Sequence, residues 1–191
     1  MQFNEGSFYH VYNRGNNKQK IFFSQENYAF FLQKVELYIA PACDIVSWVL
    51  MPNHFHFLIR ANNNTIKLVK HTPIEINSLT EGIRLLLSSY TKAIQKQTGF
   101  SGNLFQQKTK SKCVDDYSTI AFHYIHQNPL KAGLTKNLES WTFSSFTEYV
   151  GKSKHRLCNT ELAYDYLDIK STNFVADSYK VISDDLALGL F

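Results

Sequence analysis

Cysteine and proline are both scarce in this sequence of 191 residues, which contains three cysteines and four prolines. Cys43, Cys113 and Cys158 are odd in number and widely spaced, and none belongs to a Cys-x-x-Cys pair. This spacing argues against a disulfide framework and against a cysteine zinc site. It favours reduced thiols in a cytoplasmic protein.

Long apolar runs are missing as well. The first residues lack the basic patch and apolar stretch of a signal peptide, and no apolar run approaches the length of a bilayer span. We therefore expect a soluble protein without a membrane partner. The excess of basic over acidic residues is small, 20 against 16, so the net charge of +4 permits a nucleic-acid partner without requiring one.

The hydrophobic content of 44% and the chain length suffice for one domain with a buried core, with room for an appendage. Apolar periodicity and turn signals then predict the elements in order. We expect a strand over 8–14, a helix over 25–40, strands over 45–50 and 54–60 joined at Pro52-Asn53, a helix after a Ser78-x-x-Glu81 capping box that ends at Thr98-Gly99, a strand over 104–114, and a helix that Asp115 or Asp116 caps and Pro129 ends.

This order predicts an α+β fold: a ferredoxin-like antiparallel sheet with helices packed on one face. We expect residues 1–150 to form the main domain. Residues 151–191 are less clearly patterned and form a short C-terminal extension, either a few helices or a loosely held tail.

Two histidines on one predicted strand are the first candidate site. His54 and His56 point to one face, because side chains alternate along a strand, while the intervening Phe55 points to the other. Two imidazoles held side by side on rigid backbone suit a divalent metal ion. From the spacing alone, a pair of ordinary polar-face histidines is an equally good interpretation.

A second candidate lies on the last predicted helix. Tyr124 and Asn128 are one turn apart on its apolar stripe, so they are neighbours in space. Taken alone, a tyrosine on such a stripe is usually a core residue, and an asparagine before Pro129 usually ends a helix.

The two candidate segments, taken together, resemble a known family. Residues 51–59 (MPNHFHFLI) and 124–133 (YIHQNPLKAG), together with 9–15 (YHVYNRG) and 141–145 (WTFSS), are similar to the REP-associated tyrosine transposases. That family is a single-tyrosine branch of the His-hydrophobic-His endonucleases. The resemblance spans roughly residues 8 to 150.

The resemblance implies a role for each residue of the two segments. Tyr124 would be the nucleophile, His54 and His56 metal ligands, and Asn128 a third ligand through its side-chain oxygen. A site of imidazoles and an oxygen with open positions suits Mg²⁺ or Mn²⁺ bound to a phosphate. The implied activity is a metal-dependent single-stranded DNA endonuclease and strand transferase acting at hairpin repeats through a 5′-phosphotyrosine, without a nucleotide cofactor.

Basic residues could extend such a site toward DNA. Lys108, Lys110 and Lys112 alternate, so on a strand they would form one row facing a phosphate backbone, although exposed lysines often serve only solubility. Arg14 and Lys131 lie within the resembling segments and could continue this track.

Several alternatives stay open at this point. His10, His123 and His126 are competing ligand candidates, with the last two expected to be solvated or to lie behind the ligands. A catalytically silent DNA-binding protein of the same fold, or a metal hydrolase acting on a small phosphoester, would also fit, although no Gly-rich phosphate loop is present. The sequence does not distinguish a monomer from a dimer.

Overall fold

The computed structural model describes residues 1–71, 73–153 and 155–190, and its centre is a four-stranded antiparallel sheet. The strands are β1 (Phe8–Arg14), β2 (Asp44–Met51), β3 (His54–Arg60) and β6 (Lys110–Cys113), in the order β2-β3-β1-β6. This order, with every neighbouring pair antiparallel, is the ferredoxin-like arrangement. The α+β fold class expected from the sequence is confirmed.

Two long helices cover one face of the sheet. α1 (Gln25–Tyr38) and α3 (Ser78–Thr98) pack against each other, and their apolar stripes meet the odd-numbered residues of β1 and β3, such as Val11 and Phe57. Gly99 ends α3 with a left-handed φ of 69°, as the Thr98-Gly99 signal predicts. This layer is the larger of two hydrophobic cores.

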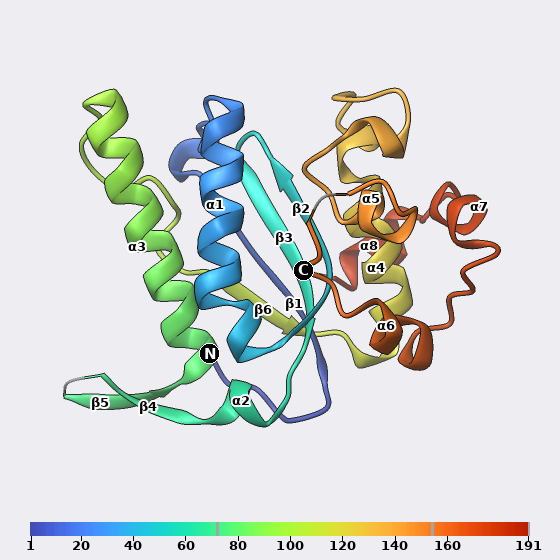
Figure 1. Ribbon diagram of the computed structural model, residues 1–191, viewed down its shortest axis with the longest axis horizontal. Coiled ribbons are helices and arrows are strands. Elements are labelled where there is room, and N and C mark those ends of the chain that lie inside the picture. Colours follow the sequence, from blue (N-terminus) through green and yellow to red (C-terminus); the bar gives the residue numbers. More distant parts are fainter. Residues whose placement is uncertain (72, 154, 191) are drawn as a thin grey trace.

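The opposite face carries a second helical layer, which the sequence-based expectation of helices on one face did not include. α4 (Ser118–Lys131) lies across β2, β3 and β1. Figure 1 shows the sheet between the two layers. Further helices of the C-terminal half also lie on this side, namely α5 (Phe146–Tyr149), α6 (Thr160–Tyr166), α7 (Phe174–Ser178) and α8 (Asp184–Leu188). This layer exists because apolar residues such as Val49 and Leu58 point to this face and need cover.

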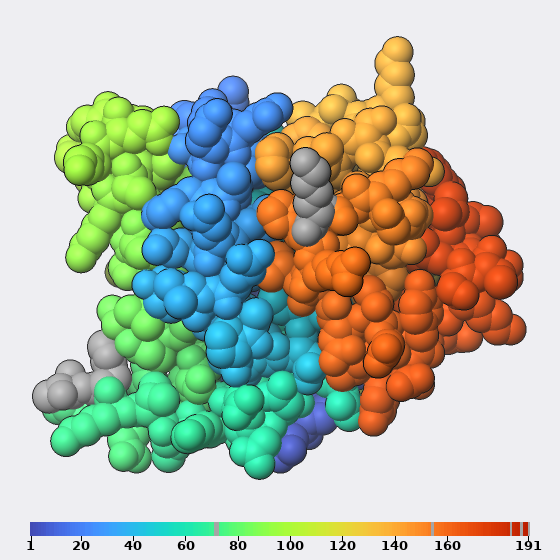
Figure 2. All heavy atoms as spheres, in the orientation of Figure 1, coloured from blue at the N-terminus to red at the C-terminus, as the bar shows by residue number. Residues whose placement is uncertain are grey.

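A short helix and a two-stranded ribbon connect β3 to α3. They are α2 (Asn63–Ile66), followed by β4 (Leu68–His71) and β5 (Ile74–Asn77). The ribbon projects from the edge of the molecule in Figures 1 and 2. Four 3₁₀ turns complete the described elements: Asn16–Lys18, Ala40–Ala42, Asp115–Tyr117 and Leu138–Ser140.

Four expected boundaries are wrong, each for a local reason. Only Lys110–Cys113 of the expected strand over 104–114 is extended, because consecutive residues Leu104 and Phe105 both enter the core and break the alternation. Asn77, not Ser78, caps α3 by accepting a hydrogen bond from the Thr80 N–H at 2.9 Å.

The other two boundaries concern α4. Asp115 does not cap the helix, because its carboxylate accepts the Phe8 N–H at 2.5 Å instead, and Asp116 is part of the same 3₁₀ turn. Pro129 does not end the helix, because only one N–H is lost and the Ala132 N–H still reaches the Asn128 carbonyl at 2.9 Å. Asn128 therefore sits inside the last turn.

No helix within the described parts of the chain is long and apolar enough to cross a membrane.

Candidate functional site

The tip of the β2–β3 hairpin is held in place by the turn that follows β1. The Gly15 N–H donates to the Asn53 carbonyl at 2.7 Å, and the Ile21 N–H donates to the Pro52 carbonyl at 2.8 Å. Gly15 has no room for a side chain, since a Cβ there would lie 2.1 Å from the Gln19 carbonyl oxygen. These contacts fix the position of the backbone directly before His54.

His54, His56, Tyr124 and Asn128 line one cavity of about 230 Å³ between the sheet and α4. The remaining lining residues are Tyr12, Asn13 and Arg14 of β1. The structure thus brings together, from β3 and α4, all four residues that the sequence analysis singled out. Tyr12 and Asn13 were not singled out, although Tyr12 follows His10 by two positions on a strand and so shares its face.

Both site histidines are neutral at pH 7. Burial lowers the pKa of His54 from 6.5 to about 4, and the nearby positive charge of Arg14 acts in the same direction. Burial likewise holds the pKa of His56 well below 6.5, with further contributions from His10, His54 and Arg14. A neutral imidazole keeps one nitrogen lone pair, which is the form that coordinates a metal.

The donor set fits a divalent cation. The amide nitrogen of Asn128 donates to the Tyr124 carbonyl at 2.8 Å, which turns the amide oxygen away from that carbonyl and leaves it within hydrogen-bonding reach of His54. His54 Nδ1 donates to Asn53 Oδ1 at 2.6 Å, so its Nε2 holds a lone pair. An imidazole nitrogen and an amide oxygen are both ligands that a divalent cation accepts. Within the described ranges, no group of three or more His, Cys, Asp or Glu side chains is placed to hold a metal, so a third ligand would have to be of another type, such as this amide.

Tyr124 lies against His56 and Lys131. Its ring is edge-on to the His56 ring, with 6.3 Å between centroids, and Lys131 Nζ is 5.2 Å from the Tyr124 ring centre. Burial raises the pKa of Tyr124 above 10, so the phenol is protonated at neutral pH. Any nucleophilic role therefore requires activation at the moment of reaction.

Basic groups surround the cavity on the same face of the sheet. Arg14 lines it, and the guanidinium Nε is buried without a hydrogen-bond partner in the part of the chain that the structure describes. Lys110 is opposite Tyr12 and Lys112 opposite His10 in the β1–β6 register, so both lysines share the face of the histidines. Lys108 lies before β6, outside the alternating row.

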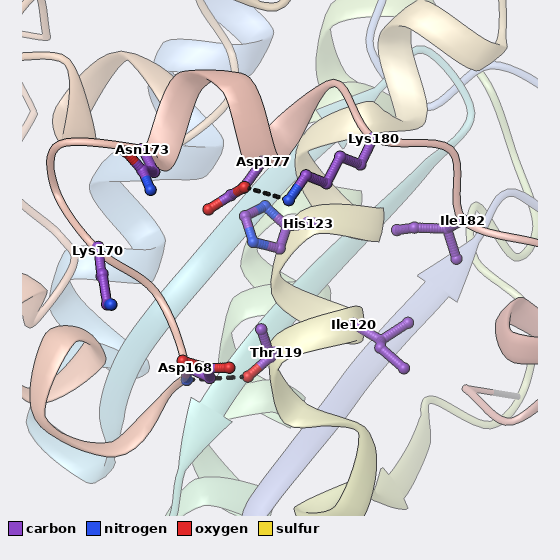
Figure 3. Close-up of a pocket in the computed structure, with 9 residues that line it drawn as sticks. All are labelled: Thr119, Ile120, His123, Asp168, Lys170, Asn173, Asp177, Lys180 and Ile182. Carbon is purple, nitrogen blue, oxygen red and sulfur yellow. Dashed lines mark hydrogen bonds and ion pairs between the residues drawn. The ribbon is translucent and has the colours of Figure 1, made fainter.

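His123 and His126 lie apart from this cavity and are buried rather than solvated. His126 packs among Phe122, Phe146 and Tyr149, and its Nε2 is 2.7 Å from Ser145 Oγ. His123 borders a different cavity of about 380 Å³ between α4 and the segment 168–182 (Figure 3). There Lys180 is paired with Asp177 at 2.7 Å.

The buried His126 makes the stability of the protein depend on pH. Burial holds its pKa well below the unfolded value of 6.5. Below pH 6.5 the unfolded chain therefore binds more protons than the folded chain, and the free energy of unfolding falls as the pH falls. At pH 5 we expect His126→Gln to recover about 1–2 kcal/mol of the stability that the wild type loses relative to pH 7. Urea denaturation at both pH values measures this, with His155→Gln, at a partly exposed histidine, as the matched control. An equal loss in wild type and His126→Gln would contradict it.

The segment 141–145 closes the free edge of β2. Trp141 Nε1 donates to the Leu50 carbonyl at 3.1 Å, and the Leu50 N–H donates to the Phe143 carbonyl at 2.9 Å. Phe143 stacks on Tyr28 of α1 with 4.0 Å between ring centroids. Figure 2 shows this orange region beside the blue α1 helix. The conspicuous Trp141 is thus an edge and packing residue.

Comparison with known proteins yields a structural likeness but no sequence family. No family model matches the chain, and no curated protein does. A solved structure of a REP-associated tyrosine transposase bound to a REP hairpin matches with a TM-score of 0.56 and 18% identity, covering 96% of this chain and 97% of that one. At this identity the likeness shows a shared fold along nearly the whole chain.

Proposed function

We propose that this protein is a metal-dependent single-stranded DNA endonuclease and strand transferase, similar to a transposase, that forms a 5′-phosphotyrosine intermediate. The observation that carries the proposal is the convergence of Tyr124, His54, His56 and Asn128 on one cavity that Arg14 also lines. The fold shared with a hairpin-bound REP-associated tyrosine transposase supports it. By analogy with that complex, hairpin repeats are the proposed substrate.

His54, His56 and Asn128 would hold the metal ion. Imidazole nitrogens combined with an amide oxygen suit Mn²⁺ better than Mg²⁺, which prefers oxygen ligands, and both remain candidates. When bound, such an ion supplies Lewis-acid polarisation of a phosphodiester. No nucleotide cofactor is needed, because the phosphotyrosine bond conserves the energy of the broken phosphodiester.

Tyr124 would attack the scissile phosphorus. Its phenolic oxygen forms a new P–O bond, the bond from phosphorus to the 3′ oxygen breaks, and that oxygen takes up a proton as a 3′ hydroxyl while Tyr124 gives one up. Lys131 Nζ, 5.2 Å from the ring centre, would favour the phenolate form of Tyr124 as its charge develops. Rejoining reverses these steps with the 3′ hydroxyl of another strand.

Arg14 would bind the non-bridging phosphate oxygens. Its Nε is a buried donor that has no partner among the described residues, and a phosphate would supply the missing acceptor. The guanidinium also matches the planar pair of oxygens that a phosphate presents. Lys110 and Lys112 could then contact the backbone further along the same face, with Lys108 at the end of this track.

The size of the cavity favours an unpaired strand. About 230 Å³ accommodates a phosphate with part of its sugar, whereas the backbone of a rigid duplex cannot be threaded into so narrow a site. A hairpin would therefore bind outside the cavity and deliver the single-stranded flank into it.

A labelled-oligonucleotide assay tests the proposal. Full-length protein is incubated with hairpin DNA carrying single-stranded flanks, labelled at either end, with Mn²⁺ or a chelator. We expect a covalent protein–DNA adduct that retains only the 3′-side label, and a released fragment ending in a 3′ hydroxyl. Binding of DNA without an adduct in the presence of Mn²⁺ would instead support a catalytically silent DNA-binding protein.

A further inference from the structure

Two backbone carbonyls far apart in the sequence are linked to the two site histidines, each through one intervening side chain. The carbonyl of Leu190, two residues after α8, contacts His10, and the carbonyl of Lys18 contacts Asn53. His10 in turn contacts His56, and Asn53 contacts His54. A carbonyl oxygen only accepts hydrogen bonds, so donor and acceptor are fixed along each of these two hydrogen-bond chains.

The chain behind His56 begins at Leu190. His10 Nδ1 lies 2.8 Å from the Leu190 carbonyl oxygen, so Nδ1 carries the proton of His10. His10 has no solvent exposure, and a buried neutral imidazole with its proton on Nδ1 has its lone pair on Nε2. Its Nε2 therefore accepts a hydrogen bond from His56 Nδ1 at 2.8 Å. The planes of the two rings are 20° apart, with 5.0 Å between ring centroids.

The chain behind His54 begins at Lys18. Asn53 Nδ2 donates to the Lys18 carbonyl at 3.2 Å, which orients the amide so that Oδ1 faces His54. His54 Nδ1 then donates to Oδ1 at 2.6 Å. The Lys18 carbonyl is presented by a tight turn in which Asn17 and Lys18 both have left-handed φ angles, 51° and 59°.

We propose that the Leu190 carbonyl through His10, and the Lys18 carbonyl through Asn53, fix His56 and His54 as Nδ1–H tautomers, so that each ring has its lone pair on Nε2, the atom that would coordinate a metal. His10 and Asn53 are thus positioning residues, and the C-terminal segment is part of the site. The direction of both hydrogen-bond chains follows from the hydrogen bonds and from the burial of His10. Their benefit to metal binding rests on the proposed function.

The tautomers are measurable in the metal-free protein. Exposed neutral histidines favour the Nε2–H tautomer in water, so the expected pattern is the reverse of the default. Two-bond ¹H–¹⁵N correlation spectra of the labelled full-length protein at pH 7 distinguish the protonated nitrogen of each ring. We expect Nδ1–H at His10, His54 and His56. An Nε2–H tautomer at His54 or His56 would overturn the proposal.

Two variants distinguish the effects of the two hydrogen-bond chains. His10→Leu removes both hydrogen bonds of the first chain, so the tautomer bias is lost at His56 and kept at His54; Asn53→Leu has the opposite effect. In each variant Mn²⁺ affinity, measured by electron paramagnetic resonance, is expected to weaken roughly 10–100-fold. His10→Gln should keep an Mn²⁺ affinity within about threefold of wild type, because the glutamine amide can both donate and accept. This change is smaller than the loss that usually follows removal of such a partner.

The Leu190 carbonyl is tested through its side chain. Leu190 is fully buried, so Leu190→Asn should displace the carbonyl and give mixed tautomers at His56, whereas Leu186→Asn on the exposed side of α8 should not. Unchanged tautomers in Leu190→Asn, or wild-type Mn²⁺ affinity in folded His10→Leu, would contradict the proposal. If the wild type shows the expected tautomers but binds no Mn²⁺, the proposed metal-dependent function fails and the tautomer assignment stands.

Discussion

Tyr124→Phe is expected to abolish the covalent protein–DNA adduct and to lower cleavage by at least about 10⁴-fold, as loss of a nucleophile typically does. The ring of Tyr124 packs edge-on to His56, and phenylalanine preserves this contact. Folding and DNA binding should therefore be retained. Denaturing gels with labelled hairpin DNA measure the adduct, and fluorescence anisotropy measures DNA binding.

Tyr12→Phe is the matched control for this experiment. Tyr12 is the other tyrosine that lines the cavity, so it tests whether any nearby phenol can serve as nucleophile. We expect Tyr12→Phe to keep the adduct, with cleavage reduced less than about tenfold, which is the scale of losing a hydrogen bond. An adduct of undiminished yield in Tyr124→Phe would refute the assignment. Loss of the adduct in Tyr12→Phe alone would transfer the role to Tyr12.

The fold was largely predictable because its elements are coded by local periodicity. α1 spans Gln25–Tyr38 against an expected 25–40, and β1 spans Phe8–Arg14 as expected, since each has a regular apolar pattern and a turn signal at its end. The second helical layer was not predictable in the same way. Whether a sheet is covered on one face or on both depends on long-range packing, which here involves helices after residue 146.

The candidate site was predictable only in part. The alternation of a strand places His54 and His56 on one face, and helical spacing places Tyr124 beside Asn128, but only resemblance to a family joined the two pairs. The proposed roles of Asn53 and His10 could not be inferred from the local sequence pattern. Their hydrogen bonds depend on carbonyls of Lys18 and Leu190, and any residue type supplies a carbonyl, so the sequence carries no signal for them.

The site histidines give the second large expected effect. His54→Ala and His56→Ala should each lower Mn²⁺-dependent cleavage by roughly 10³-fold at limiting Mn²⁺, since each removes one of three proposed ligands and the remaining pair holds the ion less tightly. His155→Ala, which alters a partly exposed histidine near Glu36, is the matched control and should cleave like the wild type. Single-turnover cleavage after chelator treatment, titrated with Mn²⁺, measures the effect.

Rescue by excess Mn²⁺ distinguishes a ligand from a nucleophile. If His54 and His56 act by holding the ion, raising the Mn²⁺ concentration should restore part of the cleavage in each alanine variant, whereas Tyr124→Phe should stay inactive at every concentration. The double variant should also lose much less than the product of the two single losses, because residues that act as a unit are not additive. Unchanged cleavage in both single variants, after removal of adventitious metal, would refute the ligand assignment. Cleavage lost without any rescue would mean that the two imidazoles contact the DNA or Tyr124 directly, in keeping with the burial of His56 against the Tyr124 ring.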